Sequence, residues 1–212
     1  MEIANAVQER ETRQLKRLWT LIDAVYAIVL VVMVLTLPYP DEVNWTGASI
    51  WGFLVAHHEG LILALIGTIL VVLYWVQSNV LFGNLARTDN RHTILALGQV
   101  FFLLFYLYSI GLGIDVPEDP HALALQSILA CLVGLAAAGS WRYACHDRRL
   151  LSDRIQADET RHLQLNFLTE PLTALITIPF AYVGRGYWEL AWLSYPLVAR
   201  LLRGWKRPVD NA

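Results

Sequence analysis

The chain has 212 residues, of which 56% are hydrophobic and 16% are charged, and its formal net charge is −2. Globular proteins carry about 25% charged residues, so the shortage of charge indicates a chain that is surrounded mainly by lipid. The aromatic content of 11% excludes intrinsic disorder, and the near-neutral charge disfavours a nucleic-acid partner. Two cysteines cannot build a disulfide framework, so Cys131 and Cys145 are expected to be inert buried thiols.

Apolar runs of membrane-spanning length follow a polar amino-terminal segment at residues 1–17. A helix that crosses a bilayer needs about 20 mostly apolar residues. Pro38 and Pro40 are expected to end the first run, and Pro117 and Pro120 punctuate the turn before the fourth. We therefore predict one all-α domain over residues 1–212, with six transmembrane helices within 18–202 and a tail at 203–212. The six predicted spans are residues 18–37, 61–82, 93–114, 122–144, 163–183 and the shorter, more polar 187–202.

The positive charges predict how these spans are oriented. With six spans, all sixteen Lys and Arg residues except Arg185 lie in the amino-terminal segment, in loops 83–92 and 142–162, or near the carboxy-terminal end. Positively charged residues next to transmembrane helices stay on the cytoplasmic side. Both termini are therefore expected to face the cytoplasm.

Asp23 is an informative polar residue because an ionisable side chain inside a bilayer is costly and usually functional. A stripe of residues at helical spacing runs along the same span, and Asp23 points away from it. We expect the stripe to face a pore or a partner, while Asp23 accepts hydrogen bonds inside its own bundle. Ordinary helix packing of the stripe and a purely structural Asp23 remain alternatives. The stripe consists of Arg17, Leu21, Ala24, Ile28, Val32 and Leu35.

The segment from Arg17 to Asp23, read as Arg-Leu-Trp-Thr-Leu-Ile-Asp, resembles a known first-helix signature. That signature, R-x-x-x-F-S-D followed by an aliphatic helix, belongs to the transmembrane protein 175 family of lysosomal and bacterial potassium channels. Segments 74–82 and 97–105 are similar to parts of the family's second and third helices. Leu21 and Ile22 replace Phe-Ser of the signature, and residues 77–79 (Gln-Ser-Asn) replace family histidines and asparagine.

The resemblance implies a homotetrameric, potassium-permeable cation channel in a prokaryotic plasma membrane, with a pore lined by the first helix. Position by position, Ile28, Val32 and Leu35 would form a hydrophobic constriction. The sequence has no Thr-Val-Gly-Tyr-Gly filter, so a ring of backbone carbonyls is not expected. Ala27 and Val31 stand where eukaryotic members carry hydroxyl residues, which implies modest selectivity for potassium. No cofactor is expected beyond the permeating ion.

The same resemblance implies a polar network that ties the first helix to the second and third helices. Its members would be Arg17, Asp23, Gln77 and Asn79, with Gln99 as a further candidate. Arg17 and Asp23 would hold the first helix in register at the cytoplasmic mouth of the pore.

Other ionisable residues offer weaker candidate sites. His57, His58 and Glu59 have side chains of the types that bind metal ions. Adjacent helical residues point about 100° apart and cannot readily share one ion, so we interpret the three residues as the outer end of the second span and not as a metal site. Glu170 falls in the inner part of the fifth span. Glu189 is expected to pair with Arg185 at the i,i+4 spacing.

Motifs for enzymatic chemistry are missing from the sequence. It contains no phosphate-binding glycine loop, no nucleophile elbow and no zinc-ligand spacing, so an enzyme is not expected. Two alternatives to a channel remain. One is a proton-coupled transporter that uses Asp23, Glu170 or His57, and the other is a non-conducting membrane scaffold.

Overall fold

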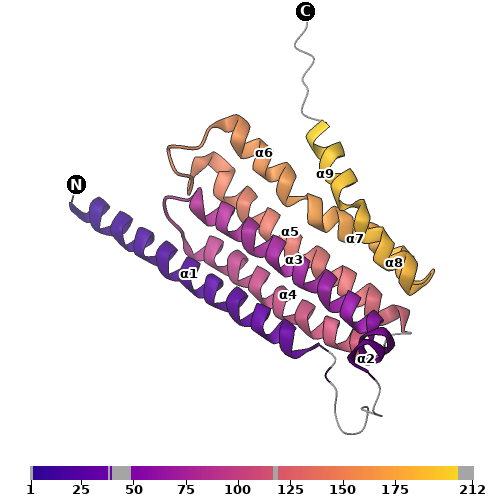
Figure 1. Cartoon of the computed structure of the whole chain (residues 1–212). Helices are drawn as coiled ribbons and strands as arrows, with labels where there is room; N and C mark the ends of the chain where they lie inside the picture. Colours follow the sequence, from indigo (N-terminus) through magenta and orange to yellow (C-terminus); the bar gives the residue numbers. More distant parts are fainter. Residues whose placement is uncertain (1, 38, 40–48, 117–118, 205–212) are drawn as a thin grey trace, which may run out of the picture.

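The computed structural model describes residues 2–37, 39, 49–116 and 119–204 (Figure 1). Within these ranges the regular elements are helices, joined by turns and loops, and one isolated antiparallel bridge links Leu85 to Leu151. Pro38, Pro40, Pro117 and the predicted tail beyond Gly204 lie outside the described residues. The elements in chain order are α1 (Glu2–Leu35), α2 (Ile50–Ala56), α3 (His58–Gly83), α4 (Asn90–Asp115), α5 (Pro120–Cys145), η1 (His146–Arg148), α6 (Ala157–Phe167), α7 (Thr169–Ala181), α8 (Arg185–Ala191), η2 (Trp192–Ser194) and α9 (Tyr195–Gly204).

Four of the described helices, α1, α3, α4 and α5, are long and apolar enough to cross a membrane. Each contains most or all of one of the first four predicted spans. Asp89 begins α4 by accepting a hydrogen bond from the His92 N–H at 2.8 Å, and Asp119 begins α5 in the same way through the His121 N–H. Both carboxylates cap a helix whose first N–H groups have no partner within the helix. The all-helical, membrane-type fold predicted from composition is confirmed.

The fifth and sixth predicted spans are each divided between shorter helices. Residues 163–183 comprise the end of α6 and all of α7, and residues 187–202 comprise α8, η2 and most of α9. Prolines account for both breaks, because Pro171 and Pro196 have no N–H to donate to the carbonyls of Phe167 and Trp192 four residues earlier. Six continuous spanning helices are therefore not what the described chain contains.

The helix α5 lies at the centre of the bundle, packed between α4 on one side and α7 on the other (Figure 1). Of the most apolar part of α5, 61% is buried, compared with 28% for α1 and 33% for both α3 and α4. Small residues allow this close packing. A Cβ atom on Gly134 would lie only 2.6 Å from Cδ of Pro171 on α7.

The positively charged segments of the described chain gather at one end of the bundle. The amino-terminal part of α1 lies beside the α3–α4 and α5–α6 connections there (Figure 1). Arg87 links all three, because its Nε lies 3.8 Å from the Glu11 carboxylate and donates to the Arg149 carbonyl at 2.9 Å. Arg185 lies at the opposite end, where it pairs with Glu59 at the start of α3.

Candidate functional site

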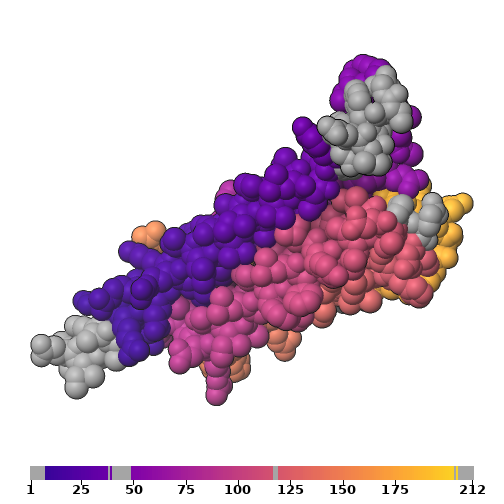
Figure 2. Space-filling view, turned by 90° about the horizontal axis from the view of Figure 1, so that it is seen from below, coloured from indigo at the N-terminus to yellow at the C-terminus, as the bar shows by residue number. Residues whose placement is uncertain are grey.

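The helix α1 is covered by the rest of the chain on one face only. Its buried residues recur every three or four positions and pack against α3 and α4. The opposite face is apolar too, but 61% of Ile28 and 76% of Leu35 is exposed. Figure 2 shows α1 as a ridge along the outside of the bundle. The buried face consists of Leu15, Leu18, Ile22, Tyr26, Val29 and Met33.

The predicted stripe coincides with this uncovered face. Arg17, Leu21 and Ala24 are not buried and lie on it together with Ile28 and Leu35, whereas Val32 is half-buried at the edge of the face. Ala27 and Val31, the positions predicted to flank a constriction, are exposed as well. In a membrane, an apolar face of this kind contacts either acyl chains or a second protein surface. None of the stripe residues belongs to the buried core of the described chain.

Two crossed hydrogen bonds join α1 to α3. The Trp19 indole N–H donates to Oδ1 of Asn79 at 3.1 Å, and the Trp75 indole N–H donates to Oδ1 of Asp23 at 3.1 Å. Each helix supplies a tryptophan and a side-chain acceptor four residues apart, so each pair lies on one helix face. Because α1 and α3 are antiparallel, the tryptophan of each helix meets the acceptor of the other. The arrangement fixes the axial register of α1 against the bundle.

Sequence reasoning identifies Asp23 and Asn79 but misses their indole partners. Trp19 lies near the end of a predicted span, where tryptophans usually mark the membrane interface. Its N–H nevertheless donates to Asn79 of the same chain. The missing signal is the repeated spacing itself, Trp-x-x-x-Asp in the first span and Trp-x-x-x-Asn in the second. A third bond, from Gln99 Nε2 to the Tyr26 hydroxyl at 3.0 Å, ties α1 to α4.

The other two predicted members of the polar network lie elsewhere. Arg17 is exposed on the uncovered face of α1. Gln77 lies on a different side of α3, where it lines a cavity together with Glu170 of α7 and Tyr195 of α9. The structure therefore brings together Asp23, Asn79 and two tryptophans at the α1–α3 contact, without Gln77.

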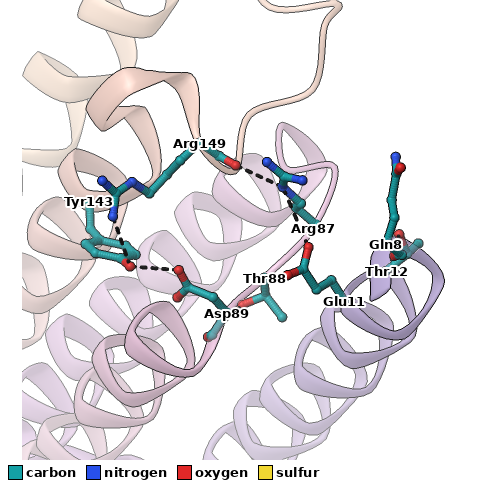
Figure 3. Close-up of polar contacts among 8 residues, drawn as sticks. All are labelled: Gln8, Glu11, Thr12, Arg87, Thr88, Asp89, Tyr143 and Arg149. Atoms are coloured by element: carbon teal, nitrogen blue, oxygen red, sulfur yellow. Dashed lines mark hydrogen bonds and ion pairs between the residues drawn. The ribbon is translucent and has the colours of Figure 1, made fainter. Parts of the chain in front are cut away.

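A cluster of polar side chains joins neighbouring helices at the positively charged end of the bundle (Figure 3). The Tyr143 hydroxyl of α5 donates to Oδ2 of Asp89 at 2.7 Å, and Arg149 donates to the same hydroxyl at 3.3 Å. The guanidinium of Arg149 also lies 5.1 Å from the centre of the Tyr143 ring. Through Arg87 and Glu11 the cluster extends to the first turns of α1.

Asp89 is held in its charged form by this cluster. Its partial burial raises the pKa, but hydrogen bonds from the His92 N–H and the Tyr143 hydroxyl outweigh burial, and the pKa lies below its usual value. Asp89 therefore serves both as the cap of α4 and as the acceptor for α5. The cluster joins three segments that are far apart in the sequence.

The ionisable residues at the opposite end form local pairs. Arg185 lies 3.1 Å from Glu189, which confirms the predicted i,i+4 pair, and 3.5 Å from the carboxylate of Glu59. His57 and His58 each place Nδ1 2.9 Å from a carbonyl oxygen of α2. Within the described ranges, no three His, Cys, Asp or Glu residues are grouped as metal ligands would be. Cys131 and Cys145 are unpaired and half-buried.

Comparisons with known proteins agree with the signature in the first helix. The model of a family described as the endosomal/lysosomal potassium channel TMEM175 matches residues 17–106. A chicken (Gallus gallus) protein described as an endosomal/lysosomal proton channel TMEM175 is 25% identical over 180 residues, which are 81% of this chain and 35% of the relative. The chain thus spans about a third of the length of that curated relative.

Two solved structures share the fold. One is described as a lysosomal potassium-selective channel TMEM175 homologue from Chamaesiphon minutus. It is matched with a TM-score of 0.73 and 15% identity, over 88% of this chain and 98% of the other. The second is a single-residue variant of the potassium channel MtTMEM175 in complex with a nanobody–MBP fusion. It is matched with a TM-score of 0.59 and 15% identity, over 89% of this chain and 90% of the other. The resemblance predicted from Arg17 to Asp23 is confirmed.

Proposed function

We propose that this chain, which is similar to the TMEM175 channels over residues 17–106, is a potassium-permeable cation channel. The proteins that it resembles are described as channels for potassium or protons. The observation that carries the proposal is the uncovered apolar face of α1 within the region that matches the family. The proposal includes no cofactor beyond the permeating ion.

The proposed pore needs several copies of the chain, because one helix cannot enclose an ion path. Four copies of α1 around a shared axis would cover the face that a single subunit leaves exposed, in keeping with the closed symmetry of most homo-oligomers. Ile28, Val32 and Leu35 would then point toward the axis and form the narrowest part of the path. Ile28 and Leu35 are exposed and free to face the axis, whereas Val32 is half-buried. The pore assignment therefore rests mainly on Ile28 and Leu35.

A constriction of aliphatic side chains would control ion flow through wetting. Isoleucine and leucine cannot replace the hydration shell of potassium, so an ion passes only while water fills the constriction. Selectivity then depends on pore width and is modest. The crossed Trp19–Asn79 and Trp75–Asp23 bonds support a constriction at a fixed depth on α1, because they hold α1 at one height relative to the bundle.

We propose further that residues 163–183 and 187–202 complete six passages through the membrane, although each is broken into shorter helices. The clustering of positive residues at one end of the described bundle supports a cytoplasmic location for that end and for both termini. The protein would reside in a prokaryotic plasma membrane as a homotetramer.

Potassium flux from proteoliposomes tests the proposal. Vesicles loaded with potassium and diluted into sodium-free, potassium-free buffer should release potassium without an added potassium ionophore when a protonophore lets protons enter as the compensating charge. Because the protonophore also collapses any proton gradient, the release should not require one. Ile28→Asn should raise the flux because an amide side chain wets the constriction, and Leu35→Ala should raise it by widening the path. Val116→Asn, at another exposed apolar position just after α4, is the matched control and should leave the flux unchanged.

The same measurement separates the channel from its two rivals. A proton-coupled transporter using Asp23, Glu170 or His57 would show saturable uptake that stops when the proton gradient is collapsed. A membrane scaffold would pass no monovalent cation at any pH, and that result would remove the channel proposal. A tetramer whose symmetry axis lies far from α1 would remove the pore assignment while leaving a channel possible through another helix.

A further inference from the structure

Two cavities meet along the side of α3 that faces α7, α8 and α9. The larger has a volume of about 540 Å³, and its walls are mainly apolar, including Ile66, Leu70 and Leu193. The smaller has a volume of about 220 Å³ and contains Gln77 and Glu170. Leu73 and Tyr195 line both cavities, so the cavities adjoin; together they are called the cleft, with an apolar part and a polar end.

The polar end contains a buried acid, Glu170, one oxygen of which has no hydrogen-bond partner among the described residues. Glu170 is only 1% exposed, and the Tyr195 hydroxyl donates to its Oε1 at 2.8 Å. Its Oε2 has no hydrogen-bond partner in the described part of the chain, and neither does the buried Oε1 of Gln77. Among the described residues that line the cleft there is no lysine, arginine or histidine. A buried carboxylate without a cation is costly, so Glu170 is either a neutral acid or is neutralised by a bound cation.

The two unpartnered oxygens at the polar end need hydrogen-bond donors, whereas Trp192 Nε1, which lines the apolar part, is a donor without a partner in the described residues. Two acceptor oxygens, one of them on an acid, match a primary ammonium group, which carries three N–H donors and a positive charge. The apolar part of the cleft would accommodate the alkyl or aryl group attached to the nitrogen.

The cleft is open to the surface that faces lipid. Ile69 and Leu193, which line its apolar part, are 51% and 68% exposed. A molecule with an apolar body therefore reaches the site from the bilayer, with its charged end moving inward along α3. This side of α3 is separate from the side that carries Trp75 and Asn79 against α1.

We propose that this cleft is a binding site for a lipophilic primary ammonium ion, with its nitrogen between Glu170 and Gln77 and its apolar body between α3 and the α8–α9 segment. The site lies within one subunit and uses no residue of the proposed pore. Its existence does not depend on the channel proposal.

Calorimetric titration of the full chain in phosphatidylcholine nanodiscs tests the proposal, with empty nanodiscs titrated in parallel. The probe is n-octylammonium, and n-octanol has the same tail with a neutral head group. We expect saturable n-octylammonium binding beyond the empty-disc signal and no comparable binding of n-octanol. Glu170→Gln should weaken n-octylammonium binding by at least about tenfold, which corresponds to about 1.4 kcal/mol.

Glu189→Gln is the matched control, because Glu189 lines the apolar cavity but is already paired with Arg185 at 3.1 Å. It should change n-octylammonium binding by less than about threefold. Equal binding of n-octanol, or unchanged binding by Glu170→Gln, would overturn the ammonium site. The absence of saturable binding would overturn it too, since Glu170 would then be satisfied as a neutral acid.

Two further variants keep the test decisive if Glu170→Gln does not fold. Gln77→Leu removes one acceptor and leaves the acid in place, and it should weaken n-octylammonium binding. Ile66→Trp should fill the apolar part of the cleft and abolish binding, while potassium flux stays unchanged. If both variants bind n-octylammonium as tightly as the wild type, the proposal is wrong. Absence of potassium flux from the wild-type protein, together with saturable n-octylammonium binding, would count against the channel proposal alone.

Discussion

The helices α1 and α5 are both strongly apolar, but the rest of the chain buries them to different extents. Their most apolar parts have mean hydropathy values of 2.5 and 2.0, yet 28% of that part is buried in α1 and 61% in α5. The helix α5 is surrounded by its own chain, whereas the more apolar α1 keeps one face uncovered. Hydropathy therefore measures suitability for a membrane, and it does not tell which apolar helix forms the core. The uncovered face is the one that needs lipid or another subunit.

The largest effect is expected where α5 approaches α7 most closely. Gly134→Ala should destabilise the protein by about 2–3 kcal/mol, because the added Cβ would lie 2.6 Å from the rigid ring of Pro171. Gly139→Ala, on the same helix, has no atom within 4 Å of its new Cβ and should be neutral or slightly stabilising. Thermal unfolding followed by size-exclusion chromatography in detergent measures both. Equal stability of the two variants would contradict the central position of α5.

A polar substitution should distinguish the two faces of α1. Val29→Asn places an amide at a position that is 1% exposed and should cost about 1–3 kcal/mol of stability. Ile28→Asn, one residue earlier, is 61% exposed and should cost less than about 0.5 kcal/mol. The same unfolding assay compares them. If Ile28→Asn proves the more damaging, the exposed face of α1 is required for the fold of the subunit.

The crossed hydrogen bonds are expected to make a smaller contribution. Asp23→Ala removes the acceptor for Trp75 and should cost about 0.5–2 kcal/mol, the range measured for side-chain hydrogen bonds between membrane helices. A double-mutant cycle with Trp75→Phe should show coupling, and a cycle of Asp23→Ala with Trp19→Phe should be closer to additive. Equal coupling in both cycles would show that the four side chains act as one network, not as two separate pairs.

The smallest effect concerns pH at the end where α5 contacts the start of α4. The folded-state pKa of Asp89 lies below its usual value, so its contribution to stability is present above about pH 4 and is lost as the pH falls through the folded-state pKa. Asp89→Asn keeps a capping acceptor but has no charge to titrate. The melting temperature of this variant should therefore fall less between about pH 5 and pH 3 than that of the wild type. Identical pH profiles would show that the Tyr143 and His92 contacts do not stabilise the Asp89 carboxylate.

The sequence alone predicted the features that depend on local composition and periodicity. The first four spans follow from run length, and the exposed stripe of α1 follows from the spacing of Leu21, Ile28 and Leu35. The Glu189–Arg185 pair was predictable because residues four apart lie on one helix face. The residues of segment 17–23 predicted the resemblance to the family, and the match over residues 17–106 confirmed it. The pore-forming role of the stripe stays a prediction.

Tertiary structure decided which helix faces meet, and local periodicity does not encode that choice. Asn79 and Gln77 are two residues apart on α3, about 200° around a helix, so one contacts α1 while the other lines a cavity with α7 and α9. The central position of α5 depends on the gap that Gly134 leaves for Pro171, which lies 37 residues further along the chain. The sequence specifies such contacts only through the packing of whole helices, because each contact requires two distant segments at one depth and one rotation.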